Sequence, residues 1–506
     1  MKFYGENVYS FIDGKFQSVL EARKMLPNLN PSDGKNLGIV QIANEHDVDM
    51  AVDAAMCAQK KWQAMGMVKR AEYFWAAARL LEDQKRDLAH LVSVESGKQI
   101  NEAIADVVEA LHMAQYDFSI GHLGMTGKVL ADEVPTKECL EILEPRGVVA
   151  AITPWNFPIA IPFWLIGLSL IFGNTVILKP SEETPICGQK IAEIFDRAGI
   201  PRGVFQVLHG EGDVGWQLVR HPGVDVVLFT GSYEVGSKIK QEVAKYDNKF
   251  CTIETGGKSA VVVLKDADLN LAVNAGILSA FKTAGQRCVT GGRVIIERPL
   301  YDAYVEKFVE IAKRIKVGDP LSGDTFYGPM INKDAVGKGL RFNKYAVEEG
   351  FNILLDRNSE PDPIHGGNWL KPFVYAMEKY RRGNESHVLQ EEAFSPHVAL
   401  IPAESAEEAI AIYNDTRYGL AGSVITNDSR LAKFARDNMK CGIWYWNLPC
   451  IGAGVRLAFG GIKKSGNLIS SASGIIPAIT HPKAVTMNYD TKIVMAQGLS
   501  SKIGEF

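Results

Sequence analysis

Residues 147–158 read GVVAAITPWNFP, an apolar run that ends in prolines, a tryptophan and an asparagine. The run Val148 to Ile152 predicts a buried strand, which a helical segment near Phe163 to Phe172 and a second strand, Thr175 to Leu178, follow. The alternation continues through Pro185 to Ala198, Val204 to Leu208, Val214 to Val219, Val226 to Phe229 and Val235 to Val243. This is the pattern of βαβ units, so it predicts a parallel sheet covered by helices.

A second α/β unit is expected from about Ser259. Its strands are predicted at Ala260 to Val263, Arg293 to Ile296 and His397 to Leu400, and the unit ends near Trp444 to Asn447. The chain of 506 residues with 46% hydrophobic content is long enough for two or three domains.

Flanking segments have other patterns. After a short extended start, apolar residues at three- and four-residue spacing predict amphipathic helices over Glu45 to Trp62 and Val68 to Leu91. Lys128 to Leu143 alternates loosely around a turn at Pro135 and Thr136, which indicates an extended hairpin. Ala484 to Tyr489 predicts a strand that joins this hairpin in an arm between subunits.

Composition narrows the classes of function. The net charge of −4 and the lack of a long basic run argue against nucleic acid as a partner. Seven dispersed cysteines without a C-x-x-C pair argue against a disulfide framework and a metal site, and they favour a reducing, cytoplasmic location. The start has no secretory pattern, and the uncharged stretch Val148 to Leu178 is too interrupted to span a membrane.

The most informative pair of motifs is ETGGK at residues 254–258 and GQRC at residues 285–288. Cys288 is a candidate nucleophile for an electron-poor carbonyl, and Glu254 is a candidate base for the water that releases the product. A lone cysteine is more often an inert core thiol, and a lone glutamate is more often a paired or surface acid. The glycines beside both residues, which permit close approach of a ligand, favour the functional interpretation.

Three further segments suit a dinucleotide. FTGS at residues 229–232 ends a strand and begins a helix, so its backbone N–H groups and Ser232 form an anion site. Residues 210–215 match G-x-G-x-x-G, but the match falls in the third βα unit rather than the first, which favours a tight turn with close helix packing over a phosphate site. Glu182, after Lys179 at a strand end, can accept ribose hydroxyls and repel a 2′-phosphate, or it is simply an acid at a helix N-terminus. This favours NAD over NADP, with NADP as the alternative cofactor.

Asn156 lies in the middle of the uncharged stretch. A buried amide needs partners, and its NH₂ group can stabilise an oxyanion. Its alternative role is to cap the loop.

Taken together, these segments resemble the aldehyde dehydrogenase superfamily over nearly the whole chain and in the correct order. The matching pieces are residues 154–158 (PWNFP), 179–182 (KPSE), 229–232 (FTGS), 254–258 (ETGGK), 285–288 (GQRC), 392–396 (EAFSP), 414–420 (NDTRYGL) and 459–461 (FGG). The departures are Thr255 for the usual Leu, Ser395 for the usual Gly, and Ala458 for the usual Pro. None of them removes a catalytic group, but Ser395 puts the cofactor geometry beside Glu392 in doubt.

The resemblance implies a role for each matching residue. Cys288 is the nucleophile, Asn156 and the backbone N–H of Cys288 form the oxyanion hole, and Glu254 activates the water that cleaves the thioester. The implied cofactor-binding residues are Trp155, Lys179, Glu182, Gly231, Ser232, Glu392 and Phe394. The implied reaction is oxidation of an aldehyde to a carboxylic acid by NAD, in a homodimer or homotetramer.

The same resemblance implies the fold class and the domains: a Rossmann-like cofactor domain, an α/β catalytic domain and a β oligomerisation arm. The expected NAD-binding domain comprises residues 1–125 and 146–257, and the catalytic domain residues 258–445. Residues 126–145 and 480–506 form the arm and tail. Residues 446–479 return to the cofactor domain and form the mouth of the substrate site.

Shorter segments resemble particular branches of the superfamily and thereby suggest a class of substrate. Residues 446–467 and 279–281 resemble the succinylglutamate semialdehyde dehydrogenase branch, whereas ETGGK is similar to enzymes that oxidise glutamate semialdehyde. Both point to a semialdehyde that carries a carboxylate, with Phe281, Arg456 and Phe459 as candidate substrate residues. Arg456 suits a carboxylate because guanidinium binds it in a bidentate way, or it is a solvated surface residue.

Three alternatives stay open at this stage. A CoA-acylating aldehyde dehydrogenase would release the acyl group to CoA, although Glu254 argues against it. A Cys-dependent hydrolase would need an activating histidine, for which His387 and His397 are the candidates. A binding protein without activity would not need Cys288, Glu254 and Asn156 together.

Overall fold

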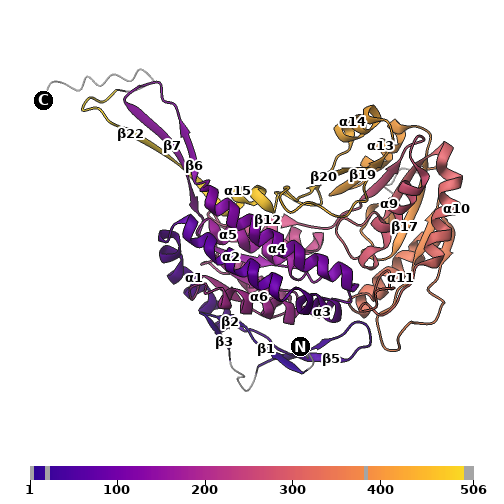
Figure 1. Ribbon diagram of the computed structural model, residues 1–506, viewed down its shortest axis with the longest axis horizontal. Helices are drawn as coiled ribbons and strands as arrows, with labels where there is room; N and C mark the ends of the chain where they lie inside the picture. The colour runs from indigo at the N-terminus through magenta and orange to yellow at the C-terminus, as the bar shows by residue number, and fades with distance from the viewer. Residues whose placement is uncertain (1–4, 18–22, 381–385, 495–506) are drawn as a thin grey trace.

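The computed structural model describes residues 5–17, 23–380 and 386–494. The end of the predicted tail, residues 495–506, lies outside this part. The largest parts of the structure are two seven-stranded sheets with their helices and a protruding three-stranded arm (Figure 1).

The first large sheet has the strand order β12-β11-β8-β9-β10-β2-β3. Its strands are β2 (Phe11–Ile12), β3 (Lys15–Phe16), β8 (Val148–Ile152), β9 (Thr175–Lys179), β10 (Phe205–Val207), β11 (Val226–Thr230) and β12 (Phe250–Glu254). The strands from β8 to β12 are parallel, and the hairpin β2–β3 adds an antiparallel edge beyond β10. The order reverses at β8, because β9 lies on one side of it and β11 on the other. Open α/β sheets bind ligands at such a switch point.

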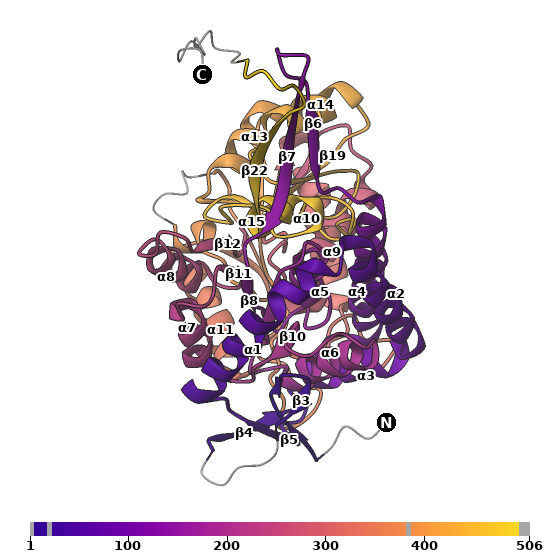
Figure 2. The same ribbon diagram turned by 90° about the vertical axis from the view of Figure 1, so that its left-hand side faces the viewer.

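Helices pack on this sheet and on one another. Those in contact with the strands are α1 (Glu45–Ala64), α5 (Ala160–Ile171), α6 (Pro185–Arg197), α7 (Gly212–Arg220) and α8 (Tyr233–Val243). A further layer comprises α2 (Met67–Asp83), α3 (Lys85–Ser96) and α4 (Ile100–Leu123), in which α4 packs on α2, α3 and α5; α2 and α4 lie side by side in Figure 2. All twelve residues of α5 are buried, as an apolar helix between a sheet and another helix requires.

The second large sheet has the order β15-β16-β17-β14-β13-β19-β20 and is parallel except for β15. Its strands are β13 (Ala260–Val263), β14 (Arg293–Glu297), β15 (Asn352–Asp356), β16 (Phe373–Ala376), β17 (His397–Ala403), β19 (Ala421–Ile425) and β20 (Ile443–Trp446). Its helices are α9 (Leu269–Phe281), α10 (Arg298–Arg314), α11 (Lys333–Glu348), α12 (His387–Gln390), α13 (Ala406–Asn414) and α14 (Ser429–Asn438). Alternate residues of β13 join two different apolar clusters, so both faces of this sheet are covered.

The arm consists of β6 (Gly127–Leu130), β7 (Lys137–Pro145) and β22 (Thr480–Asn488), and it projects away from both large sheets (Figure 1). β22 pairs antiparallel with the whole of β7, which brings segments about 340 residues apart into one sheet. The remaining elements are β1 (Glu6–Val8), β4 (Met25–Leu29), β5 (Asn36–Gln41), β18 (Tyr418–Gly419), β21 (Ile462–Lys463), the 3₁₀ turns η1 (Lys282–Gly285) and η3 (Ala472–Ile475), and α15 (Ile476–Ile479).

Most predicted elements are confirmed, including the two-sheet α/β organisation, the hairpin and the strand that joins it. One helix prediction is wrong in detail, because Val68 to Leu91 is broken at Gln84, whose φ of −100° and ψ of 5° end α2 and begin α3. The extended start is larger than predicted, since β1, β4 and β5 form a sheet of their own. Within the described residues, no helix has both the length and the apolar character that crossing a bilayer requires.

Candidate active site

The loops that leave three parallel strands of the first sheet meet at one edge. β8 ends at Ile152, β11 at Thr230 and β12 at Glu254, and the strand register places Ile152 beside Phe229 and Thr230 beside Glu254. The segments that follow, which begin at Thr153, Gly231 and Thr255, therefore start side by side at the carboxyl ends of the strands. This is the edge at which parallel sheets bind ligands.

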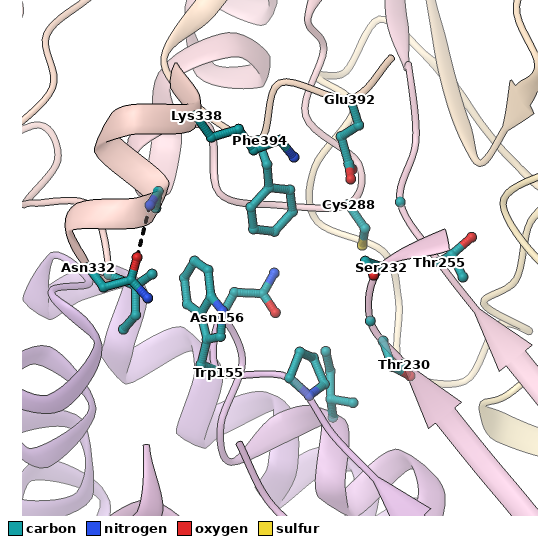
Figure 3. A pocket seen from close by; sticks show the side chains of 16 residues that line it. Trp155, Asn156, Thr230, Ser232, Thr255, Cys288, Asn332, Lys338, Glu392 and Phe394 are labelled. Atoms are coloured by element: carbon teal, nitrogen blue, oxygen red, sulfur yellow. Dashed lines mark hydrogen bonds between the residues drawn. The ribbon is translucent and has the colours of Figure 1, made fainter. Parts of the chain in front are cut away.

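A cavity of about 270 Å³ opens at this edge, between the two large sheets (Figure 3). It is lined by Pro154, Trp155, Asn156, Ile161, Thr230, Gly231, Ser232, Thr255, Gly256, Cys288, Ile331, Asn332, Ala335, Lys338, Glu392 and Phe394. The structure thus brings seven of the predicted site residues together: Asn156, Cys288, Trp155, Gly231, Ser232, Glu392 and Phe394.

Cys288 follows an unusual turn. Thr283, Ala284 and Gly285 have φ values of 55°, 54° and 69°, so three successive residues are left-handed just before the nucleophile candidate. The partly buried thiol lines the cavity. Burial raises the pKa of the thiol well above its usual range, and the negative charges of Glu254 and Glu392 raise it further. The resting side chain is therefore a thiol that must lose its proton to react.

Asn156 joins the two halves of the site. Its side chain is buried, and its Nδ2 atom donates to the carbonyl oxygen of Gln286 at 2.9 Å. In Figure 3 the Asn156 amide and the Cys288 side chain point into the same space. The amide therefore does more than cap its own loop, because it holds a donor beside the segment that carries the thiol.

Glu254 ends β12 but does not line the cavity. Its side chain is only 1% exposed, and no side chain among the described residues makes a hydrogen bond to either carboxylate oxygen. Burial raises its pKa well above the ordinary value, and the backbone N–H of Gly461 opposes this rise only in part. The carboxyl group nevertheless lies close enough to raise the pKa of the Cys288 thiol. A buried carboxyl with a raised pKa, near a nucleophile, has the properties of a general base.

The other side of the cavity has groups that suit a dinucleotide. Ser232 caps α8, whose N-terminus presents backbone N–H groups to an anion. Glu392 accepts from the backbone N–H of Gly257 at 2.9 Å, and burial raises its pKa to about 7. At Gly256 a Cβ would lie 2.1 Å from a carboxylate oxygen of Glu392, so a residue larger than glycine would displace the Glu392 side chain. The rings of Trp155 and Phe394 meet edge to face at 5.7 Å.

Comparison with known proteins identifies the family. The model of the aldehyde dehydrogenase family matches residues 19–485. The chain belongs to the aldehyde dehydrogenase family.

Relatives and solved structures agree with the family assignment. The chain is 34% identical over 465 residues to alpha-ketoglutaric semialdehyde dehydrogenase from Bacillus subtilis, which covers 91% of this chain and 94% of that protein. Its structure is similar to NAD-dependent aldehyde dehydrogenase from Sinorhizobium meliloti (TM-score 0.91, 29% identity, 97% of this chain and 96% of the other). It is also similar to betaine aldehyde dehydrogenase from Staphylococcus aureus in complex with NAD⁺ (TM-score 0.91, 27% identity, 96% of each chain). The predicted superfamily and fold class are confirmed, whereas the succinylglutamate semialdehyde branch is not.

Two predicted cofactor residues of this aldehyde dehydrogenase lie outside the cavity lining. Lys179 ends β9, and its Nζ atom pairs with Glu182 at 2.8 Å. The glycines of the G-x-G-x-x-G match also lie away from the lining. A Cβ at Gly210 would meet the Val214 side chain at 2.3 Å, which favours a tight turn with close helix packing.

The three predicted substrate residues do not lie together. Arg456 is exposed in a groove between α4 and the segment 453–456, with Glu109, His112 and Gln115 on the opposite wall. Phe459 is buried with its ring 4.9 Å from that of Trp164. Phe281 is 0% exposed and packs on Phe308, so its position does not support a contact with substrate.

Sequence reasoning missed Lys338 and Asn332, which reach the cavity of this family member from α11 and its N-cap. A single charged residue in an amphipathic helix has no motif that would distinguish it from a solvated one. Glu109 was missed for the same reason, although burial and the nearby Asp106 raise its pKa to about 7.

Proposed function

We propose that this enzyme oxidises an aldehyde to the carboxylic acid, with Cys288 as the nucleophile and NAD as the hydride acceptor. One observation carries the proposal: Cys288 and Asn156 line the same cavity as a helix N-terminus and the carboxyl group of Glu392. A thiol and an oxyanion donor thus share one space with groups suited to a phosphate and to ribose hydroxyls.

The protein's part in the first step is attack and charge stabilisation. The Cys288 sulfur, once deprotonated, forms a C–S bond to the carbonyl carbon, and the carbonyl oxygen becomes an alkoxide. The Asn156 Nδ2 group and the backbone N–H of Cys288 would donate to that oxygen. Bound NAD supplies the acceptor for the hydride that leaves the same carbon. A thioester on Cys288 results.

Glu254 would act in the second step. Its deprotonated carboxylate removes a proton from water, the water oxygen forms a bond to the thioester carbon, and the C–S bond breaks to return the thiolate. Because burial raises the pKa of Glu254, the fraction in the basic form increases as the pH rises. Deacylation is therefore expected to accelerate with pH until that group is ionised.

Neither candidate histidine of a Cys-dependent hydrolase lines the cavity that contains Cys288. His397 is buried in contact with Asn343 at 2.9 Å and with the ring of Phe373, and His387 lies in a neighbouring cavity. Their positions therefore give no support to hydrolase chemistry at Cys288.

NAD rather than NADP is the proposed cofactor. Glu182 places a carboxylate at the end of β9, where it can accept both hydroxyls of an adenine ribose and would repel a 2′-phosphate. Lys179 holds this carboxylate in place at 2.8 Å.

The proposed substrate is a semialdehyde that carries a carboxylate. The Bacillus subtilis relative is named for such a compound. In this chain, Arg456 and His112 face the groove beside α4, and Glu109 in the same groove is close enough to Arg287 for their charges to interact.

The arm would mediate a homodimer or homotetramer. Val129 and Leu130 of β6 are 74% and 52% exposed, and an exposed apolar strand at a sheet edge is normally covered by another chain.

Activity of a Cys288→Ala variant tests the main proposal. The wild-type enzyme should reduce NAD in the presence of an aldehyde, whereas the variant should bind NAD with unchanged affinity and reduce none. NADH production by the variant at the wild-type rate would reject Cys288 as the nucleophile.

A further inference from the structure

Two carboxylates of α4 face the catalytic loops. Glu102 and Asp106 are four residues apart, so they share one face of the helix, and both are buried. Neither takes part in the proposed chemistry. Buried carboxylates need partners, and here each of the two has a partner in a segment that carries Cys288 or follows Asn156.

Glu102 binds the segment before Cys288 through both of its oxygens. Oε1 accepts from the Thr283 hydroxyl at 2.8 Å and from Arg287 Nη2 at 2.5 Å, and Oε2 accepts from the Thr283 backbone N–H at 3.2 Å. Arg287 Nε donates to the Thr283 hydroxyl at 2.8 Å, which closes the ring of three residues. Burial opposes ionisation of Glu102, but Arg287 and Lys282 hold its pKa below the ordinary value.

The segment held in this way has an unfavourable backbone conformation. Thr283 and Ala284 are left-handed although neither is glycine. Non-glycine residues are disfavoured in this region and persist there only where the surroundings fix them. The bonds from Glu102 to the Thr283 backbone and side chain are therefore suited to maintain a turn that the segment would not adopt alone.

Asp106 holds the other loop in a similar way. Its Oδ1 atom accepts from the backbone N–H of Ala160, where α5 begins, and its Oδ2 atom pairs with Lys98, both at 2.8 Å. The Lys98 ammonium lies 3.6 Å from the centre of the Phe157 ring, and the Arg287 guanidinium lies 5.1 Å from the same centre. One turn of α4 thus joins the loop of Asn156 to the loop of Cys288.

We propose that Glu102 is a positioning residue, which holds residues 283–287, with the left-handed turn at residues 283–285, so that the Cys288 sulfur is presented to the Asn156 amide. The inference rests on the proposed function, because it concerns the same thiol. A carboxylate that only stabilised the fold would not affect the thiol itself, and this difference makes the role testable.

The test is a Glu102→Gln variant, which keeps the size of the side chain but removes its charge. Two results are expected together. The value of kcat falls on the order of 10-fold to 100-fold, as for a displaced catalytic group. The pH midpoint for alkylation of Cys288 by iodoacetamide falls, because the Arg287 charge that favours the thiolate is no longer neutralised.

Two comparisons sharpen the result. Asp117→Asn is a matched control, because Asp117 also carries a buried carboxyl group on α4, but this group contacts Gly167 of α5 rather than the catalytic loops. The control variant should have the same kcat and the same alkylation midpoint as the wild type. Thr283→Val, which lacks the hydroxyl, should lose kcat, and Thr283→Ser should restore it.

An unchanged alkylation midpoint in Glu102→Gln overturns the proposal, and so does an unchanged kcat. A joint loss of kcat and thermal stability without a shifted midpoint shows a purely structural role and overturns it too. If the wild-type enzyme reduces no NAD with any aldehyde, the proposed function fails, whereas the alkylation midpoint still decides whether Glu102 acts on the thiol.

Discussion

Replacement of Gly285 by alanine should damage both the nucleophile segment and the fold around it. Gly285 lies three residues before Cys288 with a φ of 69°, a conformation that disfavours residues with a Cβ. The added Cβ would lie 2.1 Å from the carbonyl oxygen of Ser395 and 2.4 Å from its carbonyl carbon. Both are backbone atoms, so no flexible side chain can move aside.

The expected loss of stability combines the cost of a left-handed alanine and the cost of its overlap with the Ser395 backbone. A left-handed residue with a Cβ costs about 1–2 kcal/mol, and overpacking of a dense region typically costs about 1–3 kcal/mol. The substitution is therefore expected to destabilise the protein by roughly 2–5 kcal/mol, or to move the backbone at Ser395 or Gly285 to avoid the overlap. A shift of about 1 Å at Cys288 would cost on the order of 10² in kcat.

Steady-state kinetics and thermal denaturation of Gly285→Ala measure these effects. Gly292→Ala is the matched control, because it lies in the same region and its Cβ would have ordinary 3.8 Å contacts with the His397 carbonyl oxygen and Lys258 Nζ. The control should keep wild-type kcat and melting temperature, whereas Gly285→Ala should lower both. Wild-type behaviour of Gly285→Ala would refute the requirement for this turn.

Three further predictions follow from single residues. Burial raises the pKa of Asp117 in the folded state well above its ordinary value of 3.8, so the protonated side chain stabilises the fold fully below pH 3.8, and this stabilisation is lost as the pH rises. The melting temperature of Asp117→Asn should therefore depend less on pH between 5 and 8 than that of the wild type. Equal pH dependence of the two melting temperatures would contradict this. Glu182→Gln should improve kcat/KM with NADP relative to NAD, and an unchanged ratio would remove Glu182 from cofactor selection. Arg456→Ala should raise KM for acidic semialdehydes much more than for neutral aldehydes, and equal increases would reject a carboxylate contact.

The sequence was most informative where strands are buried on both faces. β8 and β13 were predicted with their observed bounds, because the central strands of a parallel sheet are continuous apolar runs with little ambiguity. β12 was not predicted. Its sequence, FCTIE, has no strong pattern, and its strand conformation depends on pairing with β11 along its whole length. Tertiary pairing of this kind cannot be read from a five-residue segment.

Only the site residues that belong to a recognisable sequence motif could be predicted. Loops with glycine, proline or an isolated polar residue marked Asn156, Ser232 and Cys288, and all three line one cavity. Lys338 and Glu102 were not predicted, because each is one charged residue in a helix and only the packing of that helix aims it at the site. The buried position of Glu254, outside the cavity lining, also required the structure.

Mass spectrometry of a Glu254→Gln variant, mixed with NAD and an aldehyde, would show whether Cys288 carries the acyl group and Glu254 releases it. Without the carboxylate base, the acyl group should remain on Cys288 as a thioester, so we expect one equivalent of NADH and a mass increase on the peptide that contains Cys288. Continued turnover without an acylated peptide, or an acyl group on another residue, would contradict it.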